Sequence, residues 1–329
     1  MAKSHDQAGG THGGVIDVQT HYVPTKAARL LHDIEVDGIS RTLQLDSPMC
    51  TLDARLRAMD DAGVNVSVLS MAPIGLIADE QRRRDICRAA NDGLLEACAA
   101  HPNRFVMAAA LPLPDPSVAH AELARISGEA ALRAVQIVAQ TTGYRPDHGF
   151  DEVFSLAANQ RLPILLHPAA GVADLSPAFE DYGLASGMHA MVSHALVAAR
   201  MIQSGLLDRV PDLELILTHL GGILPFLIDR LDSRHAGPTR HPPSHYLRTR
   251  VHLDNCGYPA GPALRLAIDT VGVERLLIGS DWPSRPIAAA LNAVRGAGLS
   301  ERQERAIMWG NASRWFDPAV PRAQYSRVG

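Results

Sequence analysis

The sequence predicts an α/β fold of one domain, a (β/α)8 TIM-like barrel with loop insertions. Short apolar segments of strand character alternate with helical segments along the 329 residues, as a parallel barrel requires. The length suits a barrel of about 250 residues with inserted loops. Residues 17–24, after the start of the first strand, lack the glycines of a doubly wound nucleotide-binding sheet. We expect the barrel at residues 15–318, a flexible Gly-rich tail at 1–14 and a second tail at 319–329.

In the first half of the chain, residue patterns indicate strands and helices in alternation. Residues 64–71 are rich in β-branched side chains, which favour a strand. Leu52, Leu56 and Met59 recur at helical spacing, and Gly63 ends that helix. The expected strands are 15–20, 64–71, 105–111, 132–138 and 163–166, and the expected helices are 25–32, 52–62, 79–100, 118–126 and 151–159.

The second half continues the alternation with longer loops between the elements. Prolines, glycines and polar residues concentrate in segments 33–48, 141–149, 168–187 and 235–246, which we expect to be loops. Loops of this kind line the pocket of a barrel. The expected strands are 213–218, 251–255 and 276–279, and the expected helices are 188–207, 223–231, 262–271 and 287–309.

Composition limits the classes of function. A formal net charge of -4 argues against binding to nucleic acid or a membrane surface, since both usually need a basic face. No apolar run reaches the roughly 18 residues of a membrane span. Four cysteines without CxxC spacing, and no secretory signal, favour a cytoplasmic setting. Lys3 and Lys26 are the only lysines, which argues against nucleotide-binding P-loops and pyridoxal phosphate chemistry. We expect a small-molecule partner.

Polar side chains end four of the expected strands. Gln19 and His21 end the first strand, His167 the fifth, His219 the sixth and Asp281 the eighth. In a (β/α)8 barrel the carboxyl ends of the strands face one pocket, so these side chains should converge. A single histidine at a strand end is more often a hydrogen-bonded structural residue. Four such strand ends together favour a functional site.

The residue types suit one divalent metal ion. Two imidazoles and a carboxylate, from His21, His167 and Asp281, are typical ligands of zinc or a similar ion, with manganese as the alternative. His219 is then the expected acid/base, because an imidazole titrates near neutral pH. Gln19 can offer a carbonyl oxygen, which is a neutral and weaker ligand.

Motifs spread along the chain resemble the amidohydrolase superfamily, specifically the branch of aminocarboxymuconate-semialdehyde, γ-resorcylate and methylsalicylate decarboxylases. They occur in the family's order over nearly the whole chain. The matching pieces are residues 16–24, Asn91 with 101–105, 111–114, His167 with Pro168, 204–213, 219–225 and 279–283.

The resemblance implies a mononuclear metal held by the strand-one pair, His167 and Asp281, with His219 catalytic. Dinuclear members commonly bridge their metals with a carboxylated lysine, and this chain has no lysine after Lys26. The family has His-x-His or Glu-x-His where this chain reads Gln19-Thr20-His21, which is its main departure. A homodimer or homotetramer is also implied.

Three more residues are candidates for substrate binding. Asp254 is favoured by the resemblance, although a turn acceptor is the simpler alternative. Trp282 follows the strand-eight aspartate and is expected in or beside the pocket. Arg145 lies in a Gly/Pro loop and could bind a substrate carboxylate in bidentate fashion, although most such arginines are solvated.

We expect non-oxidative decarboxylation of an aromatic or enol-type carboxylic acid, in which His219 or Asp281 supplies the acid. Metal-dependent hydrolysis of a lactone, ester or amide is the first alternative, because both reactions use the same ligands. A metal-free barrel with altered chemistry is the second alternative, and Gln19 supports it.

Overall fold

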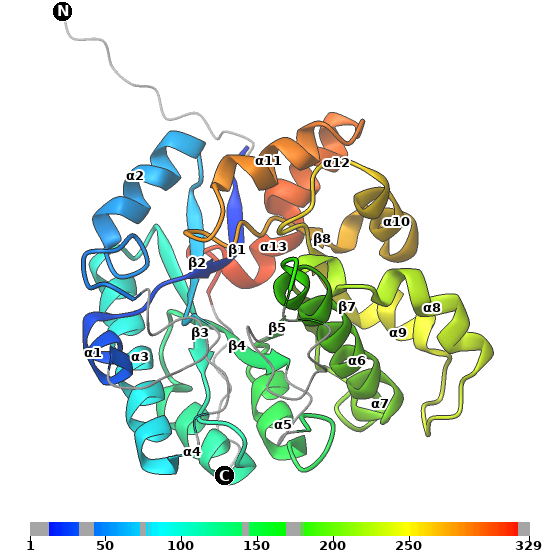
Figure 1. Ribbon diagram of the computed structural model, residues 1–329, viewed down its shortest axis with the longest axis horizontal. Helices are drawn as coiled ribbons and strands as arrows, with labels where there is room; N and C mark the ends of the chain where they lie inside the picture. Colours follow the sequence, from blue (N-terminus) through cyan, green and yellow to red (C-terminus); the bar gives the residue numbers. More distant parts are fainter. Residues whose placement is uncertain are drawn as a thin grey trace, which may run out of the picture.

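The computed structural model describes residues 13–32, 43–72, 77, 79–139, 145–168, 179 and 181–321. Within them, eight parallel strands follow one another in chain order in a single sheet. Figure 1 shows the strands at the centre and the helices around them. The predicted (β/α)8 barrel is therefore confirmed. The strands are β1 Ile16–His21, β2 Val66–Ser70, β3 Phe105–Ala110, β4 Leu132–Ala139, β5 Ile164–Pro168, β6 Leu215–Leu217, β7 Val251–Asp254 and β8 Leu276–Leu277.

Backbone contacts between the last and first strands close the barrel. Asp17 forms a parallel bridge with Ile278, and Thr20 forms one with Trp282. The Val18 amide donates to the Ile278 carbonyl at 2.8 Å. The first strand therefore has partners on both sides, and its far end is fixed beside the segment that follows β8.

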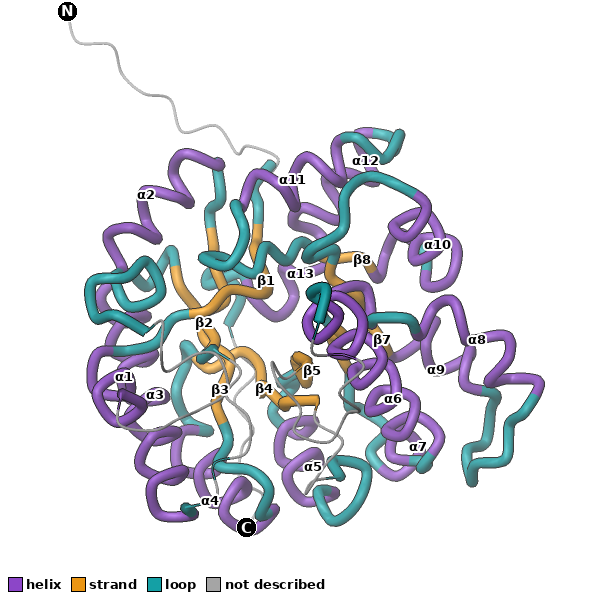
Figure 2. The backbone as a smooth tube through the Cα atoms, in the orientation of Figure 1, coloured by secondary structure: helices purple, strands orange, loops and turns teal. Residues whose placement is uncertain are grey.

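Helices cover the outside of the barrel, as the tube in Figure 2 shows. They are α1 Thr25–His32, α2 Leu52–Ala62, α3 Glu80–Ala100, α4 Pro116–Ile126, α5 Asp151–Asn159, α6 Ala190–Gln203, α7 Leu206–Arg209, α8 Leu224–Ser233, α9 Pro243–Arg250, α10 Pro262–Val271, α11 Ile287–Arg295, α12 Glu301–Arg305 and α13 Asn311–Phe316. Shorter helical turns are η2 Ala185–His189, η3 His219–Gly221, η4 Val273–Arg275 and η5 Ala306–Gly310. None of the helices in the described ranges is long and apolar enough to cross a membrane.

Side-chain packing joins the strands to the helices around them. Trp315 and Phe316 of α13 pack in one apolar cluster with Ile16, Val106 and Leu165. The Asn91 side chain of α3 donates to the Ala110 carbonyl at 2.9 Å and accepts from its amide at 2.8 Å. This pair of hydrogen bonds fixes the end of β3 against α3.

Two predicted segments were wrong in detail. The loop expected at 235–246 ends in helix α9, which begins at Pro243. Proline suits the first helical position, where its missing N–H leaves no hydrogen bond unmade, so a Pro-rich segment can still begin a helix. The single helix expected at 188–207 is divided into α6 and α7, because Gly205 adopts a left-handed conformation with φ 76° between them.

Parts of other predictions lie outside the described residues. These are most of both tails (1–12 and 322–329), residues 33–42 of the first insertion, residues 141–144 of the Gly/Pro loop, and residues 169–178 and 180 of the long loop after β5.

Candidate metal centre and adjoining acid/base site

Three predicted metal ligands meet at the carboxyl ends of the strands. His21 ends β1, His167 lies in β5, and Asp281 follows β8. The His21 Nε2 atom lies 2.9 Å from Asp281 Oδ1 and 3.2 Å from His167 Nε2. His167 Nε2 lies 3.8 Å from the same Asp281 oxygen. The structure thus brings together side chains that are 260 residues apart in the sequence.

The amide of Gln19 joins this cluster. Its Nε2 atom lies 3.2 Å from His21 Nε2, 2.8 Å from His167 Nε2 and 2.9 Å from Asp281 Oδ1. Its Oε1 atom is buried and has no hydrogen-bond partner among the described residues. Turning the amide over exchanges the two atoms and directs the carbonyl oxygen into the cluster.

Hydrogen bonds on the far sides of the two rings set their tautomers. His167 Nδ1 lies 2.8 Å from the Pro168 carbonyl, which can only accept, so Nδ1 carries the proton. The Ser70 hydroxyl donates to the Thr20 carbonyl at 2.8 Å and so can accept from His21 Nδ1, 3.3 Å away. Both rings therefore direct an unprotonated Nε2 into the cluster, as metal-ligating histidines do.

The donor set fits a divalent ion. Two imidazole lone pairs and a carboxylate oxygen face one another, and the Gln19 amide has two hydrogens for these three acceptors. Four ligands at about 2.0–2.2 Å from one tetrahedral ion stand roughly 3.3–3.6 Å apart, close to the observed separations of 2.8–3.8 Å. The chemistry and spacing of these side chains are those of a mononuclear centre.

His219 lies directly beside the cluster. The centroids of its ring and the His167 ring are 5.3 Å apart. Its backbone amide donates to Asp254 Oδ1 at 2.9 Å, so Asp254 orients the backbone that carries the imidazole. His219 and Asp281 both have left-handed backbones, with φ values of 51° and 63°. Such strain in non-glycine residues often occurs at functional sites.

Burial sets the charge of these groups. Desolvation lowers the pKa of His219 to about 3 and also lowers the pKa of His21. Burial acts to raise the pKa of Asp281, but its contacts with the His167 and His21 rings outweigh burial and hold that pKa well below its usual range. Near neutral pH, His21 and His219 are neutral and Asp281 is anionic.

Two further buried carboxyl groups, Asp17 and Asp254, lie in strands β1 and β7. Burial raises the pKa of Asp254 to about 7 and that of Asp17 to about 6. Asp17 accepts from the Ser280 amide at 3.0 Å and from its hydroxyl at 2.5 Å. It therefore does not reach the cluster as Gln19 and His21 do, and instead holds the segment that carries Asp281.

The other predicted residues occupy different surroundings. Asp254 also accepts from the Cys256 amide at 3.0 Å. Trp282 is buried, and the Arg55 guanidinium lies over its ring at 4.4 Å from the centroid. Arg145 forms an ion pair with Asp147 at 3.1 Å. Roles in substrate binding for Asp254, Trp282 and Arg145 stay predictions.

Sequence reasoning missed two arginines. Arg55 is fully buried in α2 and donates to the His21 carbonyl. Arg55 lies between Leu52 and Met59 on the apolar face of the expected helix, and this position could have indicated that it is buried. Arg285 follows β8 by a few residues and lies near His219. Only its position after the end of a strand could have indicated that it belongs to the site.

The closed parallel barrel and these converging side chains are those of a (β/α)8-barrel enzyme with a candidate site for a divalent metal ion. A family model described as amidohydrolase matches residues 16–317, and the chain belongs to this family. The predicted resemblance is confirmed.

Relatives place the chain in the decarboxylase branch of that family. A γ-resorcylate decarboxylase from Polaromonas sp. is 30% identical over 286 residues, which cover 80% of this chain and 86% of the relative. The structure of 5-carboxyvanillate decarboxylase from Sphingomonas paucimobilis is 27% identical, with a TM-score of 0.84 over 93% of this chain and 99% of its own. A dihydroxybenzoic acid decarboxylase from Polaromonas sp., with bound manganese and 2-nitroresorcinol, is 26% identical, with a TM-score of 0.78 over 92% and 96%.

Proposed function

We propose that this protein catalyses non-oxidative decarboxylation of an aromatic or enol-type carboxylic acid, using one divalent metal ion. The observation that carries the proposal is the convergence of His21, His167 and Asp281 beside His219. The decarboxylases among its relatives support the reaction type.

His21, His167 and Asp281 would hold the ion, with Gln19 as a fourth, weaker donor. When bound, a divalent ion polarises substrate oxygens and stabilises negative charge. Imidazole and carboxylate donors accept both zinc and manganese. Zinc is our sequence-based expectation, and the manganese in a related structure supports the alternative.

Decarboxylation breaks one carbon–carbon bond and leaves its electron pair on the substrate carbon, which must gain one proton. His219 is neutral at working pH because burial lowers its pKa to about 3, so it can pass on a proton only after it has received one. Asp281 is the alternative acid next to the cluster. Asp254 holds the His219 backbone in place through its hydrogen bond of 2.9 Å, which orients the ring toward the substrate.

Release of carbon dioxide from hydroxybenzoate and muconate-type acids tests the proposal. The purified protein, with its metal content measured, should release one carbon dioxide per substrate consumed and leave a product without that carboxyl group. Assays in ¹⁸O-labelled water identify the alternative, because a hydrolase incorporates the label without releasing carbon dioxide. Normal metal loading without carbon dioxide release from any of these acids would reject decarboxylation.

A further inference from the structure

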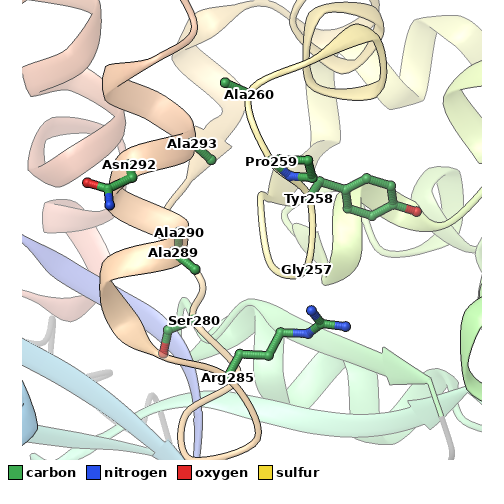
Figure 3. A pocket seen from close by; sticks show the side chains of 10 residues that line it. All are labelled: Gly257, Tyr258, Pro259, Ala260, Ser280, Arg285, Ala289, Ala290, Asn292 and Ala293. Atoms are coloured by element: carbon green, nitrogen blue, oxygen red, sulfur yellow. The ribbon is translucent and has the colours of Figure 1, made fainter.

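A cavity of about 490 Å³ adjoins the candidate site. Its walls come from residues 257–260, after β7, and from α11. Figure 3 shows Arg285 on one side of this space, with Gly257 and Tyr258 opposite. Most of the remaining wall is apolar and small, from Pro259, Ala260, Ala289, Ala290 and Ala293. The cavity therefore combines one cation with a surface suited to a ring or hydrocarbon group.

Arg285 has no anionic partner within the described part of the chain. It is exposed and forms no ion pair or side-chain hydrogen bond there, whereas Arg145, Arg200 and Arg209 are each paired with an aspartate. An arginine guanidinium presents five donors in a planar fork that matches a carboxylate. At Arg285 these donors are available to a ligand.

Gly257 leaves a space between Arg285 and the acid/base residue. A methyl group at residue 257 would lie 3.5 Å from His219 Nδ1 and 3.6 Å from Arg285 Nε. Glycine also suits the backbone there, because its φ of 77° is costly for other residues. The imidazole and the guanidinium thus face the same small space, so the cavity continues from the site where the reaction is proposed.

We propose that Arg285 binds a second carboxylate of the substrate, one that does not react, and that the apolar wall beside it holds the carbon skeleton. This inference rests on the proposed function and specifies its substrate class as aromatic dicarboxylic acids. The reacting end would then face His21, His167 and Asp281, which would hold the metal ion, and Arg285 would bind the distal end.

The chemistry of decarboxylation favours a distal carboxylate at Arg285. A guanidinium that held only the reacting carboxylate would bind the starting anion better than the transition state, because that group loses its charge as carbon dioxide forms. A cation on a spectator carboxylate binds both states equally and orients the reacting group. Arg285 is therefore a specificity-determining residue, whose loss should raise KM more than it lowers kcat.

Binding of two unreactive probes tests this assignment without turnover. Isothermal titration with benzoate and with isophthalate (benzene-1,3-dicarboxylate) should show that the metal-loaded native protein binds isophthalate at least about tenfold more tightly. Arg285→Gln should remove most of this preference, and Arg285→Lys should restore part of it. Arg295→Gln, at the end of the α11 helix that follows Arg285 and also exposed, makes the same change of charge and should leave the preference intact.

The outcomes separate this inference from the proposed function. Equal affinity for the two probes in the native protein, or an unchanged preference in Arg285→Gln, overturns the assignment of Arg285 even if carbon dioxide is released. If the protein prefers isophthalate through Arg285 but releases no carbon dioxide from any dicarboxylate, the assignment of Arg285 is supported and the proposed reaction is rejected.

Discussion

Gln19 gives the proposed metal centre a neutral amide at the position where the family resemblance leads us to expect imidazole or carboxylate. With Asp281 as the one anionic donor beside His21 and His167, the set carries less negative charge than one with glutamate at position 19. The amide also has a metal-free alternative, because its hydrogens can bond two of the three acceptors around it. A cation must displace these hydrogen bonds, so Gln19 should lower metal affinity.

Replacing Gln19 should therefore strengthen metal binding. We expect Gln19→His and Gln19→Glu to bind zinc or manganese about tenfold or more tightly than the native protein, measured by titration and by elemental analysis after dialysis against a chelator. Gln81→Glu, on the exposed surface of α3, is the control for added charge. Equal affinities in all of these proteins would show that the amide is as good a ligand as the family's residues.

His219 should affect the reaction without affecting metal retention. We expect His219→Asn to lower kcat by about 10²–10⁴-fold, the usual contribution of a general acid/base, with unchanged metal content. Asparagine tolerates the left-handed backbone found at this position. His167→Asn is the contrasting variant and should lose metal. Retained activity in His219→Asn would leave Asp281 as the acid.

At the scale of elements, the turns after the strands hold the site residues in place. The turn after β6 contains Gly222, whose φ is 63°, and a methyl group there would lie 2.2 Å from the Met191 carbonyl oxygen of α6. Because Gly222 and the Met191 carbonyl group are both backbone, neither can easily move away from an added methyl group. This close approach places α6 against the segment that begins with His219.

Gly222→Ala should consequently destabilise the protein by about 2–5 kcal/mol, from strain and overpacking together. Urea denaturation monitored by circular dichroism measures this change. Gly63→Ala is a matched control, since Gly63 has a φ of 73° but no atom within 4 Å of the added methyl group; we expect a loss of only about 1–2 kcal/mol. Equal losses in the two variants would show that the contact with α6 carries no cost.

Local patterns predicted most elements of the barrel, because apolar periodicity and glycine or proline at the ends act within a few residues. They failed where neighbours decide the structure. In β1 the register of the pairing with β2 shifts between Asp17 and Thr20. Asp17 therefore contacts different residues from those that Gln19 and His21 contact. Only the paired strand determines such a bulge.

At the scale of the whole molecule, the barrel topology made most of the site predictable. Once eight parallel strands are assumed, His21, His167, His219 and Asp281 must lie at one end. Arg285 was not predictable, because the direction of a loop side chain depends on contacts that the fold class does not specify. Arg145 illustrates the converse: its loop was recognised, but its pairing with Asp147 was not.

Buried carboxyl groups of the barrel should make stability depend on pH in an unusual direction. Burial raises the pKa of Asp254 to about 7 and of Asp17 to about 6, from a usual value of 3.8. A carboxyl group whose folded-state pKa is raised contributes stability that is fully present below its unfolded pKa and is lost as pH rises through the folded pKa. The loss should fall between about pH 4 and pH 7, from the unfolded pKa to the folded pKa.

The shifted pKa values of other groups change stability in the opposite direction or at other pH values. The lowered pKa values of His21 and His219 cost stability as pH falls below 6.5. The depressed pKa of Asp281 matters only below about pH 4, where its unfolded form becomes protonated. A comparison of the native protein with a single variant cancels these contributions.

Asp254→Asn isolates the contribution of Asp254, which has the higher pKa of these two buried carboxyl groups. Its amide keeps an oxygen for the hydrogen bonds from His219 and Cys256 and cannot ionise. The stability of the variant relative to the native protein should therefore increase from pH 4 to pH 7 and stay level above that, with a slope of at most about 1.4 kcal/mol per pH unit. Urea denaturation at each pH and fixed metal concentration measures the difference, with exposed Asp269→Asn as the control. A constant difference across this range would mean that Asp254 titrates alike in the folded and unfolded protein, and that its burial is balanced by its hydrogen bonds.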